Sequence, residues 1–84
     1  MEYNILDTAK EVLSERGEAY GSAQENYDTI AALWSAFLGF EVKPRQVVAC
    51  MILVKLSRLK KTPSHEDSVL DIAGYSEIYS RLSR

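Results

Sequence analysis

Two charged pairs at helical spacing are the residues of this chain best suited to chemistry. Lys55 and Arg58 lie three residues apart, and Asp67 and Asp71 lie four apart, so each pair shares one face of a helix. Two carboxylates suit Mg²⁺, which completes its coordination with water and phosphate oxygens, and the two cations suit the phosphate. The spacing predicts either a magnesium–phosphate site or an ion pair between Asp71 and one of the cations.

A second acidic pair could extend this metal site. Glu25 and Asp28 are spaced i, i+3 and could join Asp67 and Asp71 in a four-carboxylate cluster in a bundle core. Simpler roles exist for three of the four. Glu25 can complete a capping box that begins at Ser22, Asp28 can face water, and Asp67 can offset the helix dipole. Asp71 lies too deep in its helix for capping, so it fits a metal ligand and an ion-pair partner equally well.

Two tyrosines, a glycine and a histidine lie near these charges. Tyr20 and Tyr75 could stack on a base, although tyrosines at helix packing surfaces are more common. Gly74 costs about 1 kcal/mol relative to alanine within a helix, which suggests a close helix approach or space for a ligand. His65 is the single histidine and cannot build a metal site alone.

Four segments with helical periodicity position these side chains, at about residues 4–16, 22–38, 44–60 and 64–82. Ser22 is expected to cap the second helix, Gly39 to end it, and Pro44 to lie in the first turn of the third. Either Thr62 or Ser64 caps the fourth. The predicted fold is all-α, a single domain over residues 1–84, built as a four-helix and mostly antiparallel bundle. A core from 84 residues is marginal, so we expect oligomerisation to complete it.

The third helix is apolar on every side over residues 47–54, which makes it the central helix of the bundle or an oligomer interface. Cys50 lies inside this run and is expected to be a small buried hydrophobe. The second helix has a bulky stripe that favours core or dimer contact over a ligand site; it comprises Tyr27, Ile30, Ala31, Trp34, Phe37 and Leu38.

Charge is distributed unevenly along the chain. Residues 1–42 carry eight acidic and two basic side chains, and residues 43–84 carry four acidic and eight basic ones. The halves can attract one another within or between chains, or form two solvated faces. The net charge of −2 argues against direct nucleic-acid binding. The start of the chain lacks the cations of a signal peptide, and the apolar run is too short for a membrane span, so we expect a cytoplasmic protein.

An ordered set of motifs runs over about residues 5–80: Arg16-Gly17-x-x-Tyr20-Gly21, Asn26-Tyr27, Leu33-Trp34-Ser35-x-x-Leu38-Gly39, Met51-x-x-x-Lys55-x-x-Arg58 and Asp67-x-x-x-Asp71-Ile72-Ala73-Gly74-Tyr75. This set resembles the DUF6378 family of small phage and prophage proteins. It implies a phage protein in the cytoplasm of the bacterial host.

The closing motif is also similar to phage nucleotide-modification-associated proteins and to all-α nucleoside triphosphate pyrophosphohydrolases of the MazG and dimeric dUTPase kind. That resemblance implies a dimer or tetramer with Mg²⁺ held by carboxylates from two or more helices, which here would be Glu25, Asp28, Asp67 and Asp71. Lys55 and Arg58 would then neutralise phosphate oxygens. The chain departs from the paired Glu-x-x-Glu and Glu-x-x-Asp spacing of those enzymes. Two hypotheses follow: a Mg²⁺-dependent protein that binds or hydrolyses nucleoside triphosphates, and a non-enzymatic oligomeric interaction module or inhibitor of a host protein.

Overall fold

The computed structural model describes residues 4–9 and 22–83, and the regular structure within these ranges is entirely helical. Residues 5–9 are helical, and they are followed by α2 (Ala23–Leu38), α3 (Pro44–Lys61) and α4 (Glu66–Arg81). The predicted all-α class is confirmed. The rest of the first predicted segment, its glycine stop and Tyr20 lie outside the described residues. None of the described helices is long and apolar enough to cross a membrane.

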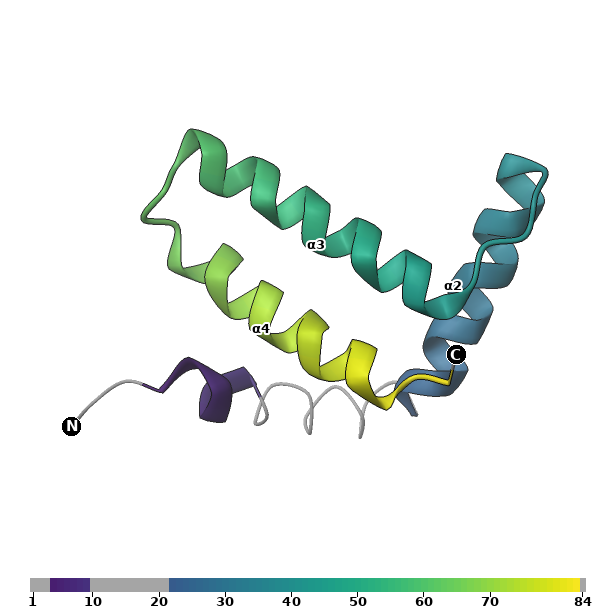
Figure 1. The fold of residues 1–84 in the computed structure, drawn as a ribbon, viewed down its shortest axis with the longest axis horizontal. Helices are drawn as coiled ribbons and strands as arrows, with labels where there is room; N and C mark the ends of the chain where they lie inside the picture. Colours follow the sequence, from purple (N-terminus) through teal and green to yellow (C-terminus); the bar gives the residue numbers. More distant parts are fainter. Residues whose placement is uncertain (1–3, 10–21, 84) are drawn as a thin grey trace.

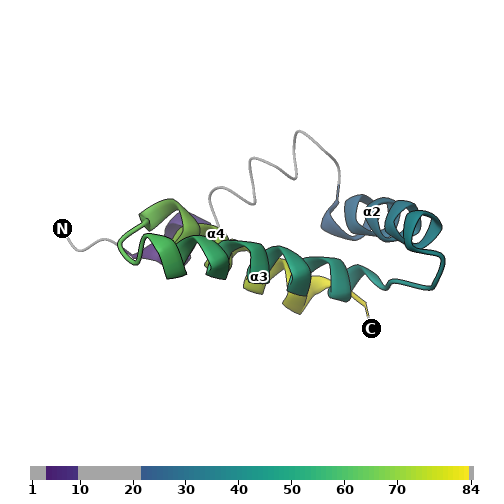
Figure 2. The same cartoon turned by 90° about the horizontal axis from the view of Figure 1, so that it is seen from above.

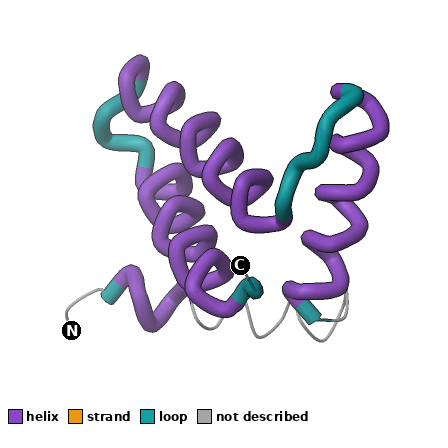
Figure 3. The backbone as a smooth tube through the Cα atoms, turned by 45° about the vertical axis from the view of Figure 1, so that its right-hand side comes forward, coloured by secondary structure: helices purple, strands orange, loops and turns teal. Residues whose placement is uncertain are grey.

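The helices form an antiparallel hairpin with a third helix across one end. α3 and α4 lie side by side and run in opposite directions, whereas α2 stands steeply against the beginning of α3 (Figure 1). The view from above shows α4 beneath α3 along most of its length (Figure 2). α2 and α3 diverge from their meeting point into a V (Figure 3). The antiparallel arrangement therefore holds for α3 and α4, while completion of a bundle by oligomerisation stays a prediction.

Local chemistry sets the ends of α2 and the start of α3 as predicted. The Ser22 hydroxyl accepts a hydrogen bond from the backbone N–H of Glu25 at 3.1 Å. Gly39 ends α2 in the left-handed conformation, with φ of 81°, and its N–H donates to the Ser35 carbonyl at 2.9 Å. Pro44 is the first residue of α3, where a missing N–H does no harm.

The predicted caps of α4 are wrong, because neither Thr62 nor Ser64 occupies that position. The cap is His65, whose Nδ1 accepts from the backbone N–H of Ser68 at 3.2 Å and lies 2.7 Å from its hydroxyl. An imidazole nitrogen can accept as a serine oxygen does. The buried Ser68 hydroxyl thereby gains a partner, and the helix starts at Glu66.

The core lies where α2 meets the end of the hairpin. Its buried cluster comprises Tyr27, Ala31, Val47, Val48, Ile78 and Leu82. Between residues 49 and 77 the one buried residue is Ser68. The far half of the hairpin is therefore held by partly buried contacts rather than by a closed apolar core.

Gly74 offers a direct test of the space beside α4. A Cβ built on Gly74 meets nothing within 4 Å, so a close helix approach does not explain this glycine. We expect Gly74→Ala to raise the free energy of unfolding by about 0.5–1 kcal/mol, measured by urea denaturation. Gly39→Ala is the contrasting variant, because its left-handed backbone makes a side chain cost about 1–2 kcal/mol. A Gly74→Ala protein less stable than wild type would contradict this expectation.

Candidate functional site

Lys55 and Asp71 form an ion pair that joins the middle of α3 to α4. The Nζ and Oδ2 atoms are 2.9 Å apart, and the two side chains are 19% and 31% exposed. Because both groups are largely withdrawn from water, their attraction is screened less than at an open surface. Asp71 was predicted to be either a metal ligand or an ion-pair partner, and in the structure it forms an ion pair.

The other charged residues of the two motifs point to water. Arg58 is exposed on α3, and Asp67 is exposed in the first turn of α4, where a carboxylate offsets the helix dipole. A second cation of α3, Arg45, also contacts α4, and the sequence interpretation missed it. Its guanidinium lies 4.7 Å from the centre of the Tyr79 ring, a favourable cation–π distance. Arg45 and Lys55 therefore hold α3 to α4 at two levels.

The acidic pair on α2 lies apart from that on α4. Glu25 and Asp28 are exposed, and an Asp28 oxygen accepts from the Gln24 amide at 2.8 Å. Across residues 4–9 and 22–83, no three or more histidine, cysteine or acidic side chains are grouped to hold a metal ion. The four carboxylates are thus not gathered into one cluster, and their roles as Mg²⁺ ligands stay predictions.

Of the two tyrosines predicted to stack on a base, Tyr75 falls within the described residues. It is half-buried and packs against the core cluster. Base stacking by either tyrosine stays a prediction.

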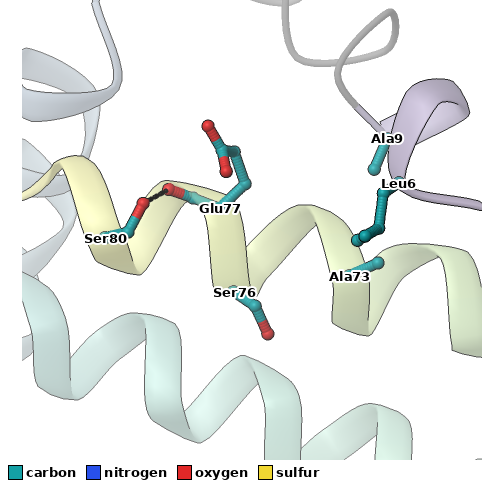
Figure 4. A pocket seen from close by; sticks show the side chains of 6 residues that line it. All are labelled: Leu6, Ala9, Ala73, Ser76, Glu77 and Ser80. Carbon is teal, nitrogen blue, oxygen red and sulfur yellow. Dashed lines mark hydrogen bonds between the residues drawn. The ribbon is translucent and has the colours of Figure 1, made fainter.

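A shallow cavity of about 300 Å³ lies between residues 6–9 and α4 (Figure 4), lined by Leu6, Ala9, Ala73, Ser76, Glu77 and Ser80. Its polar groups already have partners. Ser76 and Ser80 donate to carbonyls of their own helix at 2.9 and 2.6 Å, and Glu77 pairs with Arg81 at 2.9 Å. None of the predicted metal or phosphate ligands lines this cavity, and its acidic group would repel a phosphate.

Three strongly exposed apolar side chains lie in the second half of α2 and just beyond its end. Leu33, Phe37 and Phe40 are 65%, 89% and 64% exposed; we call them the α2 ridge. Leu33 and Phe37 are spaced i, i+4, so they share a face of the helix. The bulky stripe of α2 is therefore divided, because Tyr27 and Ala31 are buried in the core while Phe37 faces outward. The sequence already indicated an apolar surface at this end of α2, because the aromatic Phe40 directly follows Gly39, the residue that ends the helix.

A second apolar surface lies on the exposed side of α3. We call Ala49, Cys50, Leu53 and Leu56 the outer face of α3; all four are exposed. The prediction that Cys50 is buried is wrong. Because the middle of α3 is apolar all round, periodicity could not tell which side faces the core.

These features define an all-α domain with paired charges and an exposed apolar surface. The model of the family "Domain of unknown function (DUF6378)" matches residues 4–83, and the chain belongs to this family. A Gene 55 protein of Mycobacterium phage L5 is 41% identical over 81 residues, covering 94% of this chain and 52% of the relative. A Gene 55 protein of Mycobacterium phage D29 is 39% identical over 83 residues, covering 98% and 55%.

The comparisons support a small phage protein. The chain spans about half the length of the curated relatives it matches. No solved structure matches it.

Proposed function

We propose that the chain is a non-enzymatic helical module that acts by binding protein through the α2 ridge and the outer face of α3. The observation that carries this proposal is the exposure of the ridge, where Phe37 is 89% in contact with water. Apolar groups gathered on a surface in this way mark interaction sites, and aromatic side chains commonly supply much of the binding energy at protein interfaces.

The state of the charged residues supports binding over nucleotide hydrolysis. A phosphate at Lys55 would compete with Asp71, which lies 2.9 Å from its ammonium group. A metal at Asp71 would compete with the same lysine. Arg58 is exposed on α3 and does not line the cavity between residues 6–9 and α4. Nucleotide binding with Mg²⁺ and a cytoplasmic location in the host remain hypotheses from the resemblance.

The protein should neither cleave nor bind nucleoside triphosphates. Purified chain incubated with a panel of dNTPs and NTPs in Mg²⁺ should release no pyrophosphate or phosphate above a protein-free control. Its melting temperature should not move when the nucleotides are added. Turnover that scales with protein concentration and disappears in Asp71→Asn would reject the proposal and favour the metal hypothesis.

A further inference from the structure

Exposed apolar side chains gather on α2 and α3. Leu33, Phe37 and Phe40 are 65%, 89% and 64% exposed, and Leu53 and Leu56 on α3 are 64% and 47% exposed. Apolar surface gathered in this way marks an interaction site.

The two apolar surfaces carry exposed side chains at the same helical spacing. Leu33 and Phe37 on α2 are spaced by four residues, as are Ala49 and Leu53 on α3, so each pair spans about 6 Å of helix. With the helices antiparallel, Leu33 can lie over Leu53 while the large Phe37 ring covers the small Ala49 and Cys50. Packing a large side chain against small ones lets two helices approach closely without leaving voids.

Charge selects the antiparallel direction. α2 carries acidic residues and no basic ones, and α3 carries basic residues and no acidic ones. Glu25 lies eight residues before Leu33, and Lys60 lies seven residues after Leu53, so both stand about 10–12 Å from that contact. The antiparallel alignment brings Glu25 beside Lys60 and the positive end of one helix dipole beside the negative end of the other. Parallel alignment brings like helix ends together.

We propose that the occupant of this surface is a second copy of the chain. The α2 ridge of one copy packs antiparallel on the outer face of α3 of the other, and the same contact recurs through a two-fold axis. Glu25 of each copy then lies opposite Lys60 of its partner. This inference rests on the proposed function, because it names the protein that the apolar surface binds.

Charge reversal and mixing test this dimer. Sedimentation equilibrium of the wild type should show a monomer–dimer equilibrium. Glu25→Lys and Lys60→Glu should each weaken dimerisation about tenfold, because each places two like-charge contacts in the dimer. An equimolar mixture of the two variants should recover wild-type affinity as a heterodimer, since both contacts again join opposite charges. A purely intrachain effect cannot be restored by mixing, so a mixture that stays as weak as the single variants overturns the proposal.

Apolar variants and the cysteine supply independent readouts. Phe37→Ser and Leu53→Ser should be monomeric with unchanged helical circular dichroism, whereas Val69→Ser, exposed on α4 away from both surfaces, should dimerise normally. Maleimide labelling of Cys50, the single cysteine, should slow as protein concentration rises. A wild type that is monomeric throughout, or a dimer unaffected by Phe37→Ser and Leu53→Ser, overturns the dimer. Failure of the dimer would not affect the proposal that the chain is a non-enzymatic binding module. Nucleotide turnover would reject that module, and the variants above would still decide whether the chain dimerises.

Discussion

Replacing Ile78 with alanine should lower the free energy of unfolding by about 2–5 kcal/mol, the range for large-to-small changes in protein cores. Ile78 is 5% exposed and belongs to the cluster where α2, α3 and α4 meet. Ser68 is the one buried residue between positions 49 and 77, so no second apolar cluster in that span compensates for the loss. A small domain has little stability to spare, and the variant should be largely unfolded at 37 °C.

Urea denaturation followed by circular dichroism measures this effect. Val69→Ala on the same helix is the matched control, because Val69 is 39% exposed and lies outside the core cluster. Its cost should stay within about 0.5 kcal/mol. Equal losses in the two variants would mean that the core does not lie at the junction of α2 with the hairpin.

Removing either partner of the Lys55–Asp71 pair should destabilise the protein by about 1–2 kcal/mol. The side chains are 19% and 31% exposed, which places the pair between surface pairs worth about 0–1 kcal/mol and buried pairs whose breakage costs about 3–5 kcal/mol. Asp71→Asn and Lys55→Met should each show this loss. The double variant should lose less than the sum of the two, because the second change removes a charge that the first left without a partner.

The Glu77–Arg81 pair is the control for this double-mutant cycle. It lies on one helix at i, i+4, and its arginine is 53% exposed, so Glu77→Gln should cost no more than about 0.5 kcal/mol. Additive losses at positions 55 and 71 would show that the two side chains do not interact in solution.

The features that could be predicted are those determined by neighbouring residues. A serine before an amphipathic segment and a glycine after it fixed the ends of α2. Proline in the first turn fixed the start of α3. The cap of α4 was missed because three polar residues could cap it. Thr62 and Ser64 are the more common capping types, but His65 caps the helix and also gives the buried Ser68 hydroxyl a partner.

The orientation of each helix depended on contacts that periodicity does not encode. α3 is apolar all round, so the sequence did not show that Cys50 faces outward. The stripe of α2 continues from Tyr27 to Leu38, but α2 crosses only the end of the hairpin (Figure 1). Phe37 is accordingly 89% exposed. Helical spacing placed Asp71 on a face with Asp67, yet a metal site and an ion pair were equally compatible with that spacing. In the structure Asp71 pairs with Lys55 across the two helices, and metal binding at Asp71 stays a prediction.

Thermal melting with and without Mg²⁺ tests most directly whether Asp71 stabilises the fold or ligates a metal. We expect Asp71→Asn to melt below wild type in both conditions, by about 4–8 °C for each kcal/mol lost, with the same difference whether or not Mg²⁺ is present. A variant that melts above wild type without Mg²⁺, or a wild type that gains stability from Mg²⁺ while the variant does not, would contradict the structural role of Asp71.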